Sequence, residues 1–448
     1  MLQIGDFEAH GCAGITRRAF VQMGAVLPLL DGLTTRQALA DSEPSASARP
    51  AHAKSTVYIF LWGGPSHLDT FDPKPDAPYA YRGPYTTIET RTPGVRFSEL
   101  VPQLAARSDR FTLVRTHKTP DSRHPEAASI GMTGYKEDAG PIQPSFGSIV
   151  ARERSGGDLP PYVMLSRGTP RVESQVAKGY GGGHWGKAYD PFVASCSDRG
   201  EAGIPSLRLL DEVSPARLSD RRMLQSRLNQ ARSTLGREDF GKWDLFQKMA
   251  FKLLSSRGAT TALDLSLESE ETRQGYGRTS FGQSLLLARR LVEAEVPYIQ
   301  VNWSEFAEAI APRTDFGWDT HIHNFDYLPR LCPILDRALS AFLDDLYDRG
   351  LIDTTLVVAM GEFGRTPKIN REASRDHWKD CYFSIWAGGG VEPGRVIGES
   401  TRLGEYPITR AFDPPAVGAT ILDRMGVNGG VRKKLDVLRE ARVMHELL

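Results

Sequence analysis

Residues 349–364 read RGLIDTTLVVAMGEFG, and this stretch decides the class of fold. Its centre, Thr355–Met360, is an almost unbroken apolar run, which is typical of a parallel strand buried on both faces. An amphipathic helix is predicted before it over 326–349, where apolar residues recur at steps of three and four: Leu328, Leu331, Leu335, Leu339, Phe342 and Leu346. Gly350 is suited to ending that helix. A helix followed at once by a buried strand indicates an α/β protein.

The same pattern extends to both sides of this stretch. Further strands are predicted at 56–62, 111–115, 162–165, 298–302 and 382–387. Strands that alternate with helices favour a doubly wound, mainly parallel sheet covered by helices on both faces. The segment at about 205–295 differs, because its first part, 205–260, is polar, helical and rich in arginine. We predict that this segment is a helical insertion in one α/β domain over 55–448.

Composition excludes several classes of protein. The 448 residues include 55 basic and 55 acidic side chains, so the formal net charge is zero. A neutral chain offers no bulk electrostatic attraction to nucleic acid or to an anionic membrane. Its four cysteines are too few for a disulfide framework, and they lack the CxxC spacing of a zinc ribbon. We therefore expect no nucleic-acid partner.

The N-terminus carries the pattern of an export signal. Residues 16–20 read TRRAF, the apolar run 21–30 follows, and ALA at 38–40 forms a cleavage site. That run is too short, and too interrupted by Gly and Pro, to be a stable membrane span. We expect 1–40 to be a twin-arginine signal peptide and 41–54 to be a linker. The mature protein is then periplasmic or secreted, and the twin-arginine translocase is its partner during export.

Histidines and acids gather in the loops that follow the predicted strands. The set consists of His67, Asp69, His124, Asp319, His321, His323, Glu362, Asp376 and His377. Because loops after the carboxyl ends of parallel strands meet at one edge of the sheet, we expect these side chains to converge. Imidazole and carboxylate ligands suit a divalent metal such as zinc, manganese or iron, with calcium also considered, in one or two sites. Asp319 pairs with either His321 or His323, and the spacing does not choose between them.

Several phrases resemble a known family. LWGGPSHLDTFDPKP, MTGY, GWDTH, GEFGRTP and RDHW, spread over about 55–445, are similar to the DUF1501 family of exported bacterial proteins. That family is placed in the alkaline phosphatase-like superfamily, whose members include the sulfatases. The resemblance implies a doubly wound α/β core, two metal sites, and hydrolysis of phosphate or sulfate esters.

The resemblance also implies roles for individual residues. Glu362 stands where the superfamily has an aspartate ligand. Asp319 with His321 or His323 looks like the acid and histidine pair of the other metal site, and His377 looks like the late histidine of that site. Phe363 departs from the pattern, since it occupies the place of a histidine ligand.

Two further departures concern the first strand and the nucleophile. Trp62-Gly63-Gly64 ends the first strand where the superfamily usually has an acid, so His67 or Asp69 must substitute. His124 occupies the usual nucleophile position, which excludes a formylglycine there. His124 then serves as a ligand, a general acid or a phosphoryl acceptor, and the nearby hydroxyls of Ser122 and Thr119 are candidate nucleophiles.

Two main functions follow from these patterns. The first is an exported, metal-dependent hydrolase of phosphate or sulfate esters, in which Ser122 or water attacks an anionic ester, including one carried by a sulfated polysaccharide. The alternative is a non-catalytic member of the superfamily that binds anionic polysaccharide or a partner in the cell envelope. A third hypothesis is a lyase or oxidase that uses one metal ion.

Overall fold

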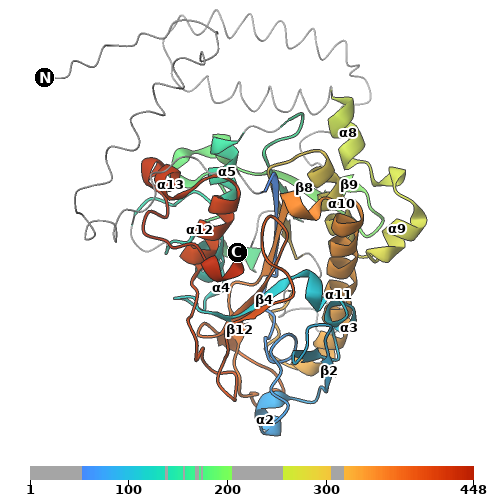
Figure 1. Ribbon diagram of the computed structural model, residues 1–448, viewed down its shortest axis with the longest axis vertical. Coiled ribbons are helices and arrows are strands. Elements are labelled where there is room, and N and C mark those ends of the chain that lie inside the picture. The colour runs from blue at the N-terminus through green and yellow to red at the C-terminus, as the bar shows by residue number, and fades with distance from the viewer. Residues whose placement is uncertain are drawn as a thin grey trace, which may run out of the picture. The chain divides into compact units, whose positions relative to one another are not determined.

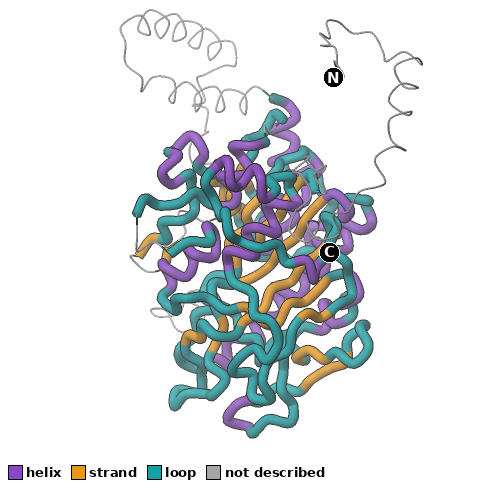
Figure 2. The backbone as a smooth tube through the Cα atoms, turned by 60° about the vertical axis from the view of Figure 1, so that its left-hand side comes forward, coloured by secondary structure: helices purple, strands orange, loops and turns teal. Residues whose placement is uncertain are grey.

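The computed structural model describes residues 53–136, 140–154, 157–166, 171–172, 175–203, 256–303 and 317–448. The predicted signal peptide, nearly all of the linker, and residues 205–255 of the predicted insertion lie outside these described residues. Figures 1 and 2 show a central sheet with helices packed along it.

The sheet has nine strands in the order β15-β4-β14-β11-β1-β10-β5-β8-β9. Their bounds are β1 (Ser55–Phe60), β4 (Thr112–His117), β5 (Tyr162–Leu165), β8 (Phe192–Cys196), β9 (Ala202–Gly203), β10 (Tyr298–Asn302), β11 (Thr355–Met360), β14 (Tyr382–Ala387) and β15 (Val396–Ile397). Five of the neighbouring pairs are parallel, namely β1 with β10, β1 with β11, β10 with β5, β5 with β8, and β15 with β4. The prediction of a mainly parallel sheet is confirmed.

Strand β14 departs from the parallel arrangement. It pairs antiparallel with both β11 and β4. The connection from β11, residues 361–381, contains only the short pair β12 (Gly364–Arg365) and β13 (His377–Trp378) and no helix. A parallel neighbour needs a long crossover, usually a helix, so this connection returns the chain in the opposite direction.

Helices cover both faces of the sheet (Figure 1). One layer contains α4 (His124–Thr133), α5 (Phe146–Glu153) and α12 (Pro414–Arg424); α12 contacts both other helices, and α5 contacts β5 and β10. The other layer contains α3 (Pro102–Ala105), α10 (Ser280–Glu293) and α11 (Asn324–Asp348). Smaller elements at the periphery are α2 (Tyr79–Arg82), α8 (Arg257–Leu263), α9 (Glu270–Gly275), α13 (Gly429–Leu435), β2 (Thr87–Glu89), β3 (Arg96–Ser98), β6 (Arg171–Val172) and β7 (Gln175–Val176).

Helix α11 is the helix predicted over 326–349, and it begins two residues earlier. It contains Pro329 and Pro333, which a helix interior normally disfavours because each removes a backbone hydrogen bond. The carbonyl of Phe325, which Pro329 leaves without its helical donor, accepts a hydrogen bond from the Tyr85 hydroxyl at 2.5 Å. The apolar stripe of the helix is buried as predicted, including Leu331, Leu335 and Leu339.

The strand directions place the functional loops together. Strands β4 and β11 are both antiparallel to β14, so they run in the same direction as β1 and β10. The carboxyl ends of these four strands therefore share one edge of the sheet, where α/β proteins usually bind ligands. Within the described residues, no helix combines the length and apolar character needed to cross a membrane.

Candidate metal centre

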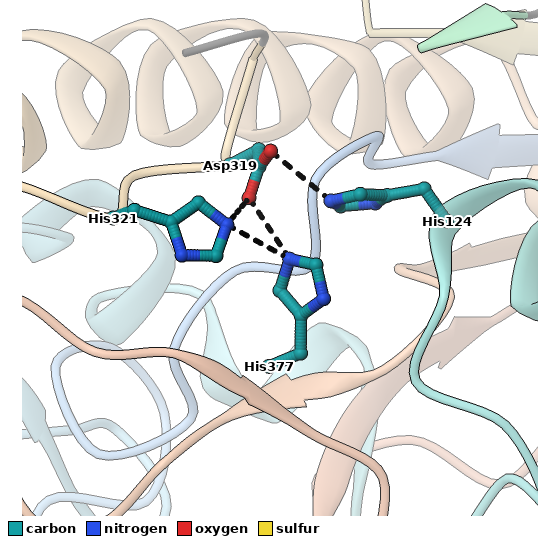
Figure 3. A group of neighbouring side chains, drawn as sticks. All are labelled: His124, Asp319, His321 and His377. Carbon is teal, nitrogen blue, oxygen red and sulfur yellow. Dashed lines mark hydrogen bonds and ion pairs between the residues drawn. The ribbon is translucent and has the colours of Figure 1, made fainter. Parts of the chain in front are cut away.

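Four side chains from distant parts of the sequence meet at this edge of the sheet (Figure 3). His124, Asp319, His321 and His377 each offer one ligand atom, and these atoms all lie within 4.8 Å of one another. Asp319 is central to the group. Its Oδ1 lies 2.8 Å from Nε2 of His321 and 3.1 Å from Nε2 of His377, and its Oδ2 lies 3.1 Å from Nε2 of His124.

The backbone around Gly63 places Asp319. Gly63 follows β1 and adopts φ +96°, and a Cβ atom there would lie 2.1 Å from the backbone nitrogen of Asp319. Trp318 donates its backbone N–H to the carbonyl of Trp62 at 2.9 Å, so the two chain segments run side by side. Only glycine accommodates both this conformation and this approach.

The three imidazoles are oriented by hydrogen bonds from their outer nitrogens. Nδ1 of His124 lies 2.7 Å from Oε1 of Glu362, and Nδ1 of His377 donates to the carbonyl of Ser122 at 2.7 Å. Nδ1 of His321 faces Oδ1 of Asp376 at 3.4 Å. Each Nδ1 therefore has an acceptor outside the cluster, and in the tautomer with the proton on Nδ1 the three Nε2 atoms are free to bind a metal ion.

Ionisation in the cluster reflects the same contacts. Burial by itself would lower the pKa of His124, but its contacts with the carboxylates of Asp319 and Glu362 outweigh burial and raise that pKa to about 9. Burial also opposes ionisation of Asp319, yet contacts with the three histidines and Arg365 hold its pKa far below the usual range. Burial lowers the pKa of His377, although Asp319 opposes that change.

The donor set fits a bound cation. Nε2 of His124 is buried and has no hydrogen-bond partner among the described residues, although Oδ2 of Asp319 is only 3.1 Å away. Nε2 of His321 and Nε2 of His377 lie 3.0 Å apart. Lone pairs this close repel unless a proton or a metal ion lies between them. Tetrahedral zinc with ligands at 2.0–2.1 Å separates them by about 3.3 Å, which resembles these spacings. Three imidazoles with one carboxylate suit zinc or manganese better than calcium, which prefers oxygen.

Comparison with known proteins identifies the family. A family model described as "Protein of unknown function (DUF1501)" matches residues 53–432. The chain belongs to the DUF1501 family. The resemblance inferred from its sequence phrases is confirmed. No curated protein matches the chain.

Three solved structures are similar to this DUF1501 protein at low identity. The phosphonate monoester hydrolase SpPMH from Silicibacter pomeroyi is 11% identical, with 88% of this chain and 76% of that chain covered and a TM-score of 0.38. The PsFucS1 sulfatase from Pseudoalteromonas sp. is 11% identical, with 84% and 68% covered and a TM-score of 0.34. A mutant of TAB5 alkaline phosphatase is 10% identical, with 84% and 98% covered and a TM-score of 0.34.

Five of the predicted ligands of this DUF1501 protein lie outside the cluster, and two of these, Asp69 and His67, have buried partners elsewhere. Both oxygens of Asp69 accept hydrogen bonds from the guanidinium of Arg375, at 2.7 and 2.9 Å, and both side chains are fully buried. Nε2 of His67 lies 2.8 Å from the carbonyl of Gly404, and burial lowers the pKa of His67. These contacts give both residues structural roles beside the site.

Of the two histidines that could pair with Asp319, His321 lies in the cluster and His323 does not. His323 precedes α11 in a left-handed conformation, is largely exposed, and has Nδ1 3.8 Å from Asp326. Asp376 is also exposed and touches the outer nitrogen of His321. Ser122, the predicted nucleophile, contributes its carbonyl to the orientation of His377.

Glu362 and Arg365 contact residues of the cluster without belonging to it. Oε1 of Glu362 accepts the N–H of Gly63 at 2.9 Å and contacts His124, so Glu362 orients an imidazole and is not one of the four clustered residues. Nη2 of Arg365 donates to Oδ1 of Asp319 at 2.8 Å. Sequence reasoning did not include Arg365 among the site residues. Its position in GEFGRTP, three residues after Glu362, was the available signal.

A separate cavity of about 630 Å³ lies near the opposite end of α4. Its lining includes Gly134, Tyr135, Phe412, Leu438 and Arg442. None of the predicted site residues lines it, so the candidate chemistry is located in the histidine cluster and not in this cavity.

His117, at the end of β4, predicts how the free energy of unfolding depends on pH. It is fully buried, its Nε2 lies 2.6 Å from the Ser384 hydroxyl, and burial lowers its pKa to about 3. The unfolded chain therefore binds a proton below about pH 6.5 that the folded chain does not bind, so stability falls as the pH drops from 6.5 towards 3. Because of this histidine, we expect the free energy of unfolding to fall by about 2–3 kcal/mol when the pH drops from 6.5 to 4.5.

The measurement is urea unfolding of the metal-free protein at both pH values, compared with His117→Gln, which keeps a donor to Ser384. The variant should lose less stability over this interval than the wild type. Equal losses in the two proteins would contradict the prediction.

Proposed function

We propose that this DUF1501 protein is an exported, metal-dependent hydrolase of phosphate or sulfate esters. The observation that carries the proposal is the convergence of three Nε2 atoms and the Asp319 carboxylate at the carboxyl edge of the sheet, with an acceptor near each Nδ1. His124, Asp319, His321 and His377 would hold the ion. When bound, a divalent ion polarises an ester oxygen and offsets the negative charge that develops during hydrolysis.

Exposure within the cluster indicates the side from which a substrate enters. The side chain of His321 is 40% exposed and that of His377 is 21% exposed, whereas that of His124 is only 8% exposed. His124 and Glu362 therefore form the inner wall, and an anionic ester approaches past His321. The nucleophile is water or the hydroxyl of Ser122, which lies two residues before His124, the first residue of α4.

For the test, a chelator first removes bound metal ions from the protein, which is then reloaded with zinc or manganese. Its substrates are p-nitrophenyl phosphate, bis-p-nitrophenyl phosphate, p-nitrophenyl sulfate and a sulfated polysaccharide. We expect hydrolysis of at least one of these to require the ion and to be lost in His377→Ala. Ser122→Ala separates the two nucleophiles, because only attack by water survives that change. A loaded protein that binds the polysaccharide intact and hydrolyses none of the esters would instead support the non-catalytic alternative.

Export through the twin-arginine route is a separate part of the proposal. It rests on TRRAF at 16–20 and ALA at 38–40, which lie outside the described residues. Replacing both Arg17 and Arg18 by lysine should leave an uncleaved precursor in the cytoplasm, detected by cell fractionation and immunoblotting. Normal export of the double variant would refute this route, and a variant with both Arg107 and Arg110 replaced by lysine serves as the control.

A further inference from the structure

The family resemblance implies two metal sites, but the side chains at the edge of the sheet accommodate one. We propose that the cluster binds a single divalent ion and that the buried guanidinium of Arg365 supplies a fixed positive charge in place of a second ion. This inference rests on the proposed function, because it concerns the same site and the same class of anionic substrate.

Arg365 is held rigidly against the cluster. It is 1% exposed, and its Nη2 donates to Oδ1 of Asp319, the same oxygen that faces His321 and His377. Its Nε donates to the carbonyl of Gly64 at 3.0 Å, and Nη2 also donates to the carbonyl of Gly63. An arginine is charged at every relevant pH. Its charge is therefore a permanent part of the site, next to the carboxylate that a second ion would have to share.

Two of the residues predicted as further ligands are engaged elsewhere. Asp69 is paired with Arg375, and His67 faces the carbonyl of Gly404. Phe363, which replaces a histidine ligand of the superfamily, packs its ring 4.9 Å from the ring of His124 and 4.5 Å from that of His377. Phe363 thus contributes an apolar ring to this side of the cluster in place of a ligand for a second cation.

The net charge of the buried groups also favours a single bound ion. Asp319 and Glu362 carry one negative charge each and Arg365 carries one positive charge, so these three buried groups sum to −1 when ionised. One divalent ion brings the sum to +1, which attracts an anionic ester. A second divalent ion would bring the sum of these buried groups to +3, and uncompensated buried charge is strongly unfavourable.

The first experiment counts the ions. The purified full-length chain is stripped, reloaded with excess zinc or manganese, desalted, and analysed by plasma mass spectrometry. One ion per chain is the expected result. Two ions per chain would overturn this inference and leave the proposed function intact. No bound ion would instead overturn the proposed function itself.

The second experiment tests the charge of Arg365 with inorganic phosphate as the probe. Phosphate binding to the ion-loaded protein is measured by calorimetry for the wild type, Arg365→Lys and Arg365→Met, with Arg349→Met as a distant control. Removing a fixed charge next to the site should weaken phosphate binding at least about tenfold in Arg365→Met. Arg365→Lys, which keeps the charge, should remain within a few-fold of the wild type.

Equal phosphate affinity in the wild type and Arg365→Met would overturn the role of this charge. Circular dichroism and thermal unfolding report whether each variant folds. If Arg365→Met does not fold, phosphate binding to Arg365→Asn decides the question by the same criterion, and the ion count of the wild type decides the number of ions independently.

Discussion

Replacement of Asp319 by asparagine is expected to weaken divalent metal binding by more than about 100-fold. Loss of a residue that merely orients a ligand typically weakens binding by 10–100-fold, and Asp319 contacts all three histidines of the cluster. Asparagine keeps an oxygen that accepts the hydrogen bond from Arg365, so the fold should persist. Calorimetric titration of the stripped protein with zinc measures the affinity, and circular dichroism checks the fold.

A matched control is Asp326→Asn, which removes an exposed carboxylate beside His323, outside the cluster. Its metal affinity should equal that of the wild type. If Asp319→Asn retained wild-type affinity in a folded protein, the ion would have to bind elsewhere, and the proposed function would lose the observation that carries it.

Replacement of Asp69 by asparagine is expected to lower the free energy of unfolding by about 3–5 kcal/mol, because it leaves the buried guanidinium of Arg375 without its counter-ion. Asp69 is not part of the metal cluster, so the metal affinity of the folded fraction should not change. Urea unfolding measures the first effect, and zinc titration well below the unfolding midpoint measures the second.

The double variant Asp69→Leu with Arg375→Met supplies the control for this prediction. It removes both charges and should recover part of the lost stability, since an apolar pair of similar volume often replaces a buried ion pair without loss. Recovery will be partial because Arg375 also donates to the carbonyls of Thr366 and Tyr81. The opposite pattern, in which Asp69→Asn loses metal affinity with little change in stability, would show that Asp69 is a ligand.

Local sequence patterns were sufficient for most of the sheet. Strands β1, β10 and β11 lie where apolar runs predicted them, and α11 lies where the apolar stripe predicted a helix. The direction of β14 was not predictable from its own residues, because an apolar run reads the same in a parallel and an antiparallel strand. The short connection through β12 and β13 decided that direction.

The position of the site followed from the same reasoning. Histidines and acids placed after parallel strands meet at one edge, and His124, Asp319 and His377 do so although they are far apart in the chain. The choice of His321 over His323 needed the tertiary structure. His323 donates its backbone N–H to the carbonyl of Glu372 in a left-handed conformation before α11, and its ring is exposed.

The sequence by itself determined the α/β class, the family, and the group of loops from which the site is built, because these depend on periodicity and on motifs that are local in the chain. Only the tertiary structure decided which acids face the cluster. Asp69 and Glu362 are both candidate ligands in the sequence, but Arg375 lies 306 residues from Asp69 and neutralises it, while Glu362 is held by Gly63 and His124. The role of a carboxylate is set by its nearest buried partner, and that partner comes from packing between distant segments.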